Sequence, residues 1–200
     1  MATIVKIGPA DHGRPITEEQ LRTGEFKEGY KYEVIDGRLY VSYEPDAPQG
    51  LTEWWLFMKL NAYSIKHSEI INYVWVKSRV FVHSRPDLTV PEPDLAAYHD
   101  FPFHLPRKKL QWENVSPILV AEVLSPDDPD KDLVRNVELY LLVPSIKEYW
   151  IVDGLEDPDR PSMLVYRRHG TKWRKIDVAP GETYTTRLLP GFKLLLDPRR

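Results

Sequence analysis

Apolar and polar residues alternate in two short runs within residues 30–43, separated only by Asp36 and Gly37. Alternation of this kind is typical of half-buried strands. An Asp-Gly pair between two such runs is a strong signal for a tight turn. The sequence therefore predicts a β-hairpin here, with Glu33 inside its first strand.

Helical patterns precede and follow this hairpin. Thr17 and Gln20 have the spacing of a capping box, so a short helix should begin at this point. From Thr52 to about His67, apolar residues recur every three or four positions, which is typical of an amphipathic helix. Residues 44–50 are rich in turn formers and are predicted to form a loop.

The stretch from Pro117 to Asp153 has the pattern of a strand, a turn, a helix and a second strand. Its first strand is apolar except for Glu122. A carboxylate inside an apolar strand is costly unless a partner compensates its charge. Glu122 is therefore the first candidate for chemistry, and the rest of the chain is judged by whether it can reach this residue.

The helix of this stretch is expected to begin near Asp130, and its register decides which side chains face the sheet. Four residues at three- and four-residue spacing share one face: Leu133, Asn136, Val137 and Tyr140. Asn136 is therefore predicted to point inward. Arg135 lies about 100° round the helix, so we expect it to pair with Glu138 in solvent.

The remaining segments add strands. Residues 72–82 alternate and predict a strand, and residues 94–98 predict a short strand that opens with an acid. Residues 100–116 form a long connection. A second hairpin is predicted over residues 162–178, and the tail from residue 185 should add a last strand.

Mixed strands around a helical crossover favour an α/β fold that borders on α+β, with helices flanking a central mixed sheet and additional β-hairpins. Residues 1–16 are predicted to form a loose N-terminal arm. Residues 17–200 are predicted to form one domain, because a chain of 200 residues with 42% apolar content can build one substantial core.

Charge and composition exclude several classes of protein. The formal net charge is −3, without the basic excess of a general polyanion binder. The chain has no cysteine, which excludes disulfides and thiolate metal sites and favours a reducing compartment. No run of about 18 apolar residues predicts a membrane span. A cytoplasmic location without membrane contact is therefore expected.

Three acids lie in predicted strands or at their ends: Glu33, Asp94 and Glu122. Asp94 and Glu122 are 28 positions apart, which suits neighbouring strands. Two carboxylates at one sheet edge repel each other unless a hard cation lies between them, and Mg²⁺ prefers such oxygen ligands. Such an ion can activate water and neutralise charge on a phosphate. The alternative is that each acid only caps a turn or pairs with a nearby Arg or Lys.

Five segments follow one another in a characteristic order: YEVIDGRLYV, PEPDLAAY, ILVAEVLSP, EYWIVD and RLLPGFKLLL. Asp132 and Tyr140 add a D-x(7)-Y spacing between the third and fourth. From about Thr17 to Leu196, the chain resembles the Uma2 family (DUF820) of the PD-(D/E)XK nuclease superfamily. The resemblance implies a restriction-endonuclease-like core that hydrolyses DNA phosphodiester bonds with Mg²⁺, or with Mn²⁺ in its place.

The resemblance also implies roles for the three acids. By position, Asp94 matches the aspartate of the PD motif, and Glu122 matches the second acid. Both would be catalytic residues that bind the metal. Glu33 matches a glutamate that completes the metal site in related nucleases, so it is expected to be a third metal ligand.

The lysine of the superfamily motif is missing from its usual places. Leu124 stands two residues after the second acid, and Asn136 stands where Uma2 sequences commonly carry a lysine on the helix. Lys131, in the turn, is another candidate for the missing charge. Loss of one charged catalytic group commonly lowers a rate by about 10²–10⁴. Two hypotheses follow: an endonuclease weakened by Asn136 at a catalytic position, and a degenerate nuclease fold kept as a binding or interaction module.

A basic cluster and a pair of tryptophans each allow two interpretations. The basic cluster Arg107–Lys109 is typical of a solvated loop, but in a nuclease it could contact the DNA backbone. Trp54 and Trp55 belong either to the core or to a dimer contact, so a homodimer remains an alternative to a monomer.

Overall fold

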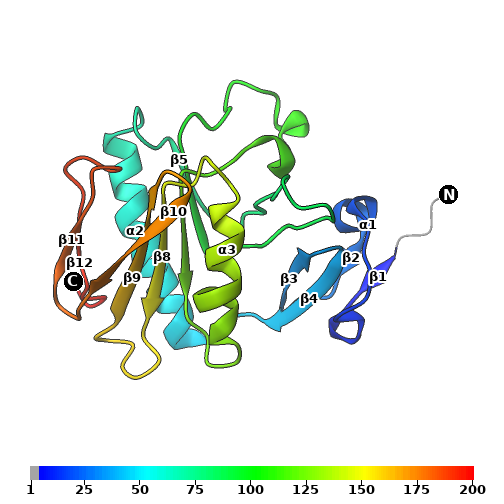
Figure 1. Ribbon diagram of the computed structural model, residues 1–200, viewed down its shortest axis with the longest axis horizontal. Coiled ribbons are helices and arrows are strands. Elements are labelled where there is room, and N and C mark those ends of the chain that lie inside the picture. The colour runs from blue at the N-terminus through cyan, green and yellow to red at the C-terminus, as the bar shows by residue number, and fades with distance from the viewer. Residues whose placement is uncertain (1–4) are drawn as a thin grey trace.

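The computed structural model describes residues 5–200 and builds them around one central sheet (Figure 1). Its strands are β5 (Tyr73–Val76), β6 (Leu95–Tyr98), β7 (Leu119–Val123), β8 (Glu148–Asp153), β9 (Ser162–His169) and β10 (Lys172–Val178). Their order in space is β10-β9-β8-β7-β6-β5. β7 and β8 are parallel, and all other neighbours are antiparallel. The predicted central mixed sheet is thus confirmed.

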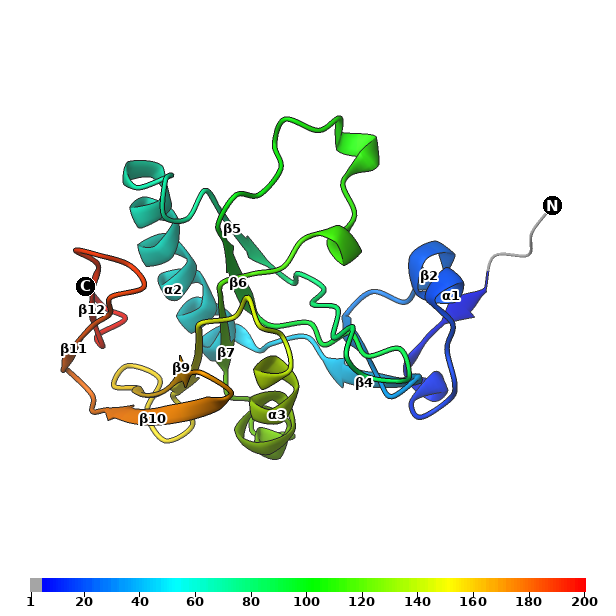
Figure 2. The ribbon, with the colours of Figure 1, turned by 45° about the horizontal axis from the view of Figure 1, so that its top comes forward.

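Helices cover both faces of this sheet. Helix α2 (Ala47–Lys66) packs on one face, and helix α3 (Asn136–Leu141) packs on the other (Figure 2). A π-helical turn, η4 (Lys131–Arg135), leads into α3. Side chains alternate across a strand, so Leu119 and Ala121 of β7 meet the α2 side while Val120 meets the α3 side. The crossover from β7 through α3 to β8 is what makes these two strands parallel.

Within residues 5–200, three small two-stranded sheets lie outside the central one. They pair β3 (Tyr30–Ile35) with β4 (Arg38–Tyr43), β1 (Lys6–Ile7) with β2 (Glu25–Phe26), and β11 (Thr183–Thr185) with β12 (Lys193–Leu195). Short 3₁₀ turns occur at η1 (Pro9–Asp11), η2 (Arg107–Lys109) and η3 (Trp112–Asn114). In Figure 1, the β3–β4 hairpin lies beyond α3, at the opposite end of the molecule from β11 and β12.

The local signals at the first hairpin and first helix are confirmed. Asp36 and Gly37 both have positive φ, 49° and 73°, as a tight hairpin turn requires. Helix α1 (Glu18–Thr23) begins with the predicted capping box. The backbone N–H of Gln20 donates to Oγ1 of Thr17 at 3.2 Å, and that of Thr17 donates to Oε1 of Gln20 at 3.0 Å. The second hairpin, β9–β10, also forms as expected.

Helix α2 begins five residues earlier than the pattern predicts. Asp46 caps it, since the backbone N–H of Gln49 donates to Oδ1 of Asp46 at 3.0 Å. Pro48 lies in the first turn, where a missing N–H costs nothing. The prediction of a loop through residue 50 was therefore wrong, and the extra turn brings Gln49 to the site described below.

The strand predicted over residues 72–82 ends at Val76. Lys77 has a φ of 55°, which breaks the extended conformation. Val80 and Val82 nevertheless remain buried, and their backbone N–H groups donate to the carbonyls of Pro91 and Thr89. The apolar alternation of this segment thus reflects burial beside residues 89–91 rather than membership of the central sheet.

The two ends of the chain also differ from expectation in part. Residues 5–16 are packed rather than loose: Ile7 and Ile16 are buried, and β1 pairs with β2. The first four residues of the expected arm lie outside the described residues. The tail does add a last strand, but β12 pairs with β11 and not with the central sheet. Among residues 5–200, no helix is both long and apolar enough to cross a membrane.

Candidate active site

Asp94 and Glu122 come together at one end of two neighbouring strands. Asp94 directly precedes β6, and Glu122 lies in β7, one residue beyond the Leu95–Ala121 pair. The backbone N–H of Asp94 donates to Oε2 of Glu122 at 3.2 Å, and that of Val123 donates to Oδ2 of Asp94 at 2.8 Å. Both acids are buried, with 7% and 0% of their surfaces exposed.

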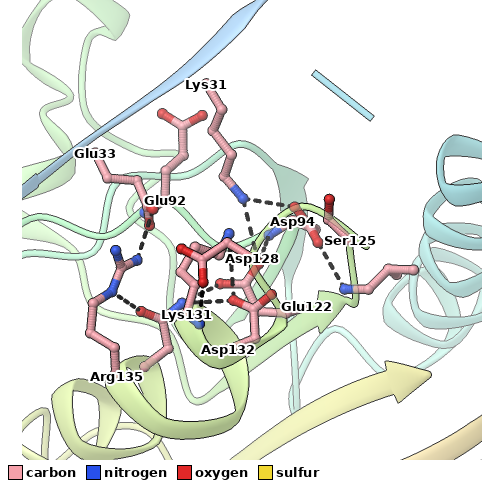
Figure 3. Close-up of polar contacts among 12 residues, drawn as sticks. Lys31, Glu33, Glu92, Asp94, Glu122, Ser125, Asp128, Lys131, Asp132 and Arg135 are labelled. Carbon is pink, nitrogen blue, oxygen red and sulfur yellow. Dashed lines mark hydrogen bonds and ion pairs between the residues drawn. The ribbon is translucent and has the colours of Figure 1, made fainter. Parts of the chain in front are cut away.

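The cation between these acids is Lys31, which the sequence reasoning missed. Its Nζ donates to Oδ1 of Asp94 at 2.8 Å and to Oε2 of Glu122 at 3.5 Å (Figure 3). Burial by itself lowers the pKa of Lys31, but Asp94, Glu122 and Glu33 outweigh this effect and raise the pKa well above its usual value. Lys31 is therefore a permanent cation at neutral pH.

Asn136 points inward as predicted and holds two acids together. Its Nδ2 donates to Oε1 of Glu122 and to Oδ1 of Asp132, both at 3.0 Å. The hydroxyl of Tyr140 donates to the same Oε1 of Glu122 at 3.0 Å. Burial and the charge of Glu122 raise the pKa of Asp132 well above its usual range. The uncharged amide thus orients Glu122 but adds no positive charge.

Glu33 lies beside this group but is engaged by other donors. Arg135 donates from Nη2 to Oε2 of Glu33 at 2.8 Å, and the backbone N–H of Glu92 donates to Oε1 at 3.1 Å. Burial alone would raise the pKa of Glu33, but Lys131, Arg135 and Lys31 lower it to about 2. Glu33 is thus ionised and paired, and its assignment as a metal ligand stays a prediction.

The expected solvent pair of Arg135 with Glu138 was wrong. Arg135 instead donates to Glu33 and, from Nε, to Oδ1 of Asn136 at 3.0 Å. The cause is the π turn η4, in which the backbone N–H of Asn136 donates to the carbonyl of Lys131. A π turn closes i→i+5 hydrogen bonds, so side chains do not follow the α-helical register used for the prediction.

Lys131 and Leu124 occupy the other positions considered for the missing lysine. Nζ of Lys131 lies 3.4 Å from Oδ1 of Asp132, and its side chain is 13% exposed. Leu124 is buried in the apolar cluster beneath α3 and supplies no polar group. Lys31 and Lys131 are thus two cations that line the same cleft as Asp94.

The site contains more carboxylates than cations. Helix α2 contributes Glu53, whose Oε1 accepts from Nε2 of Gln49 at 3.1 Å, and this amide also donates to the carbonyl of Val123 at 3.2 Å. Burial and the charge of Asp94 raise the pKa of Glu53 to about 8. Burial likewise raises the pKa of Glu92 to about 7. Glu53 and Glu92 therefore remain partly protonated near neutral pH. An added positive charge would reduce the repulsion among the carboxylates of the site.

The raised pKa of Glu53 predicts that stability falls as pH rises. A carboxyl whose folded pKa is about 8, against an ordinary 4.5, favours the folded state below pH 4.5, and this contribution is lost as pH rises through 8. We expect Glu53→Gln to stabilise the metal-free protein at pH 8 by roughly 2–4 kcal/mol, with little effect at pH 5. Thermal melts in EDTA at both pH values measure this change.

The control for this prediction is Glu156→Gln, a change at an exposed acid in the loop after β8. It should leave the melting temperature unchanged at both pH values. In the Glu53→Gln variant, stability should still fall somewhat as pH rises, because the pKa of Glu92 is also raised. An unchanged difference between pH 5 and pH 8 in Glu53→Gln would contradict the assigned pKa.

A cleft of about 80 Å³ leads from the surface to Lys31 and Asp94. Ser125, Asp128 and Lys131 lie at its wall, together with residues of β4. This volume holds several waters or an ion, since one water needs about 10–15 Å³. It is smaller than the pockets of about 300–1,000 Å³ that enclose ligands. A macromolecular substrate would therefore stay at the mouth and extend only one small group inward.

The comparison with known families fits this geometry. The model of the Uma2 family, described as "Putative restriction endonuclease", matches residues 18–197. The chain belongs to the Uma2 family. The predicted family is thereby confirmed, over nearly the same range of residues as the resemblance covered.

The Uma2 chain also has the fold of a solved structure. It matches the "crystal structure of a putative nuclease belonging to DUF820 from Anabaena variabilis ATCC 29413" with a TM-score of 0.64 and 19% identity. The match covers 92% of this chain and 96% of that one. At this identity the likeness concerns the fold alone, which confirms the predicted fold class. No curated protein matches the chain.

The Uma2 site has the oxygen donors that a divalent metal requires, but Lys31 occupies the position between them. Among residues 5–200, no three carboxylate or imidazole groups converge in an arrangement ready to hold a metal. The reason is visible in the hydrogen bonds: Oδ1 of Asp94 and Oε2 of Glu122 both face Nζ of Lys31. The surplus of carboxylates fits a hard divalent cation, provided that Lys31 gives up its position between the two oxygens.

Proposed function

We propose that this Uma2 protein is a Mg²⁺-dependent DNA endonuclease that hydrolyses phosphodiester bonds. The observation that carries the proposal is the buried lysine–carboxylate centre, in which Nζ of Lys31 lies 2.8 Å from Asp94 and 3.5 Å from Glu122. A structural ion pair would need one acid for each cation. Here several acids share too few cations, and the cleft reaches two of these acids, Asp94 and Glu33.

Asp94 and Glu122 are the residues that would hold Mg²⁺, or Mn²⁺ in its place, and Glu33 is the proposed third ligand. When bound, the ion would supply an activated water and neutralise charge on the phosphate. Asn136 and Tyr140 fix the orientation of Glu122 through hydrogen bonds of 3.0 Å each. Preorganisation of this kind is what a phosphoryl-transfer site contributes, since the protein itself forms no covalent bond.

Lys31 replaces the absent motif lysine in this proposal. Its raised pKa keeps it protonated, so its role is electrostatic and not that of a general base. Once displaced from Asp94, its flexible four-carbon stem allows Nζ to turn toward a phosphate at the cleft mouth. DNA is the proposed partner, because one phosphate of a polymer can enter a cleft too small for a nucleotide.

Plasmid cleavage tests this function. We expect the protein to cut DNA with Mg²⁺ or Mn²⁺, and Asp94→Asn or Glu122→Gln to lower the rate by at least about 10². Mn²⁺ should also raise the melting temperature of the wild type by binding the folded state. That increase should shrink in either variant.

The control is Asp177→Asn, which changes an exposed acid on the edge strand β10, separated from β6 by three strands. It should keep both cleavage and stabilisation by Mn²⁺. If the wild-type protein cuts no DNA and its stabilisation by Mn²⁺ is the same in Asp94→Asn, the proposed metal site is rejected.

A second candidate is a nuclease fold that binds without cutting. The observation in its favour is Asn136, an amide where the family commonly has a lysine, together with the donors already filling all four oxygens of Asp94 and Glu122. In this case DNA binding would occur without cleavage in either metal. The same plasmid assay, combined with a gel-shift measurement, separates the two functions.

A further inference from the structure

A second hollow lies at the opposite end of β6 from Asp94. It has a volume of about 670 Å³ and lies between the edge strand β5 and the long connection of residues 100–116. Figure 2 shows this connection projecting beside β5. Half of the ten lining residues are aromatic: Tyr73, Trp75, Phe101, Phe103 and Trp112. None of its lining residues carries a carboxylate, and it shares no residue with the cleft at Lys31.

Two of the aromatic side chains in this groove are exposed to solvent, whereas Phe101 is buried. Trp75 is 43% exposed and Phe103 is 58% exposed. The rings of Tyr73 and Trp75 are nearly parallel, at 13°, with centroids 5.6 Å apart, and Phe103 stands edge-on to Tyr73. An exposed cluster of large apolar side chains costs solubility and is typical of a binding surface. Flat rings suit a ligand that stacks.

A basic turn lies at the rim of the groove. Arg107 lines it, and Lys108 and Lys109 continue the same turn, η2. Within residues 5–200, none of these three side chains forms an ion pair or a hydrogen bond. Three unpaired cations beside stacked rings match a ligand that combines phosphates with flat bases.

We propose that this groove binds a single-stranded segment of DNA, with bases stacked on Trp75 and Phe103 and phosphates at the Arg107–Lys109 turn. The inference rests on the proposed function, since it supplies a second contact for the same substrate. A duplex hides the faces of its bases, so the groove selects unpaired nucleotides. Trp75 pairs with Ala96 of β6, so the groove lies within one strand length, about 13 Å, of Asp94. A strand freed at the cleft could therefore reach it.

The charge of the groove argues against a second copy of the chain as its occupant. Two copies facing each other across this surface would bring two identical basic turns together, which like charges disfavour. A purely apolar ligand would leave the three cations without a counterion. A polyanion with aromatic bases can stack on the exposed rings and pair its phosphates with the basic turn.

Fluorescence anisotropy of a labelled 12-nucleotide thymidine oligomer in EDTA tests the stacking. Base stacking on an aromatic side chain contributes about 1–3 kcal/mol, so Trp75→Ala and Phe103→Ala should each weaken binding by roughly 5- to 150-fold. Trp75→Phe keeps a ring and should retain affinity within about threefold. The matched control is Leu155→Ala, an exposed apolar residue far along the chain. A duplex of the same length should bind more weakly and respond less to these changes.

The salt dependence tests the basic turn. Replacing Arg107, Lys108 and Lys109 together by glutamine should reduce the slope of log affinity against log salt by about two, as expected for three contacts to a single strand. The matched control replaces Lys172, Arg174 and Lys175 of β10 by glutamine. These residues lie on the opposite edge strand of the sheet, so the slope should stay unchanged.

Several outcomes overturn the proposal. The proposal is wrong if the wild-type protein does not bind the oligomer, or if both alanine variants bind it as tightly as the wild type. It is also wrong if sedimentation shows that Trp75→Ala only dissociates a dimer, which would assign the groove to a second copy. If Trp75→Ala does not fold, Phe103→Ala decides, because its side chain is mostly exposed in a connecting loop. If Trp75→Ala and Phe103→Ala leave both oligomer binding and DNA cleavage unchanged, only the groove proposal is rejected. If the oligomer binds in the groove but the protein cuts no DNA, only the endonuclease proposal is rejected.

Discussion

Replacing Lys31 by methionine is expected to lower the rate of DNA cleavage by roughly 10²–10⁴, the usual cost of removing one charged catalytic group. The same change should not weaken the binding of Mn²⁺ and should tighten it, because Nζ of Lys31 competes for oxygens of Asp94 and Glu122. Single-turnover plasmid cleavage measures the first effect, and titration of the melting temperature with Mn²⁺ measures the second. Opposite directions in the two readouts distinguish a catalytic cation from a structural one.

The control for this change is Lys77→Met. Lys77 pairs with Glu44 at the surface, where 48% of its side chain is exposed, so its loss should alter neither readout. Removing one partner of a buried pair can cost about 3–5 kcal/mol, so the melting temperature of Lys31→Met should fall and recover with added metal. Cleavage at the wild-type rate in a folded Lys31→Met protein would remove Lys31 from the mechanism.

Moving the charge should restore the activity. In the Lys31→Met background, we expect Asn136→Lys to recover cleavage by at least about tenfold, because residue 136 also reaches Glu122. In the wild-type background the same change should raise the rate less than about threefold, since the cation is already present. Plasmid cleavage by the two single variants and the double variant measures the interaction between the positions.

Asn136→Met in the Lys31→Met background is the matched control, since methionine provides similar length without charge. It should give no recovery. A gain of about 10² or more from Asn136→Lys alone would show that the natural protein lacks its cation, and would favour the degenerate-fold hypothesis with an otherwise intact scaffold.

The parts of the fold that the sequence predicted are those with local signals. The Asp36-Gly37 turn and the capping box at Thr17 are encoded within a few residues, and both formed as expected. The early end of β5 was not predictable in this way. Lys77 adopts a positive φ without being glycine or asparagine, so no residue type announced the break.

Some residues of the candidate site could likewise be predicted from the sequence, and others could not. Asp94 and Glu122 could be proposed because one opens a short apolar strand and the other lies inside one. The resemblance to the family then connected the two positions. Lys31 could not be singled out, since a basic residue in an alternating hairpin usually faces solvent. Its position two residues before Glu33 places both on the same side of β3, which was the one available signal. The contacts of Arg135 were missed because a π turn leaves no mark in apolar spacing.

The residues that surround Glu122 are far apart in the chain, and this sets when the site can exist during synthesis. Lys31 is 63 residues from Asp94 and 91 from Glu122, whereas Tyr140 follows Glu122 by 18. Contacts of such long separation can form only after the intervening chain has been synthesised. A ribosome-bound chain that ends before α3 lacks the donors that orient Glu122. The complete set of contacts around Glu122 therefore cannot form until the chain has been made beyond Tyr140, residue 140 of 200.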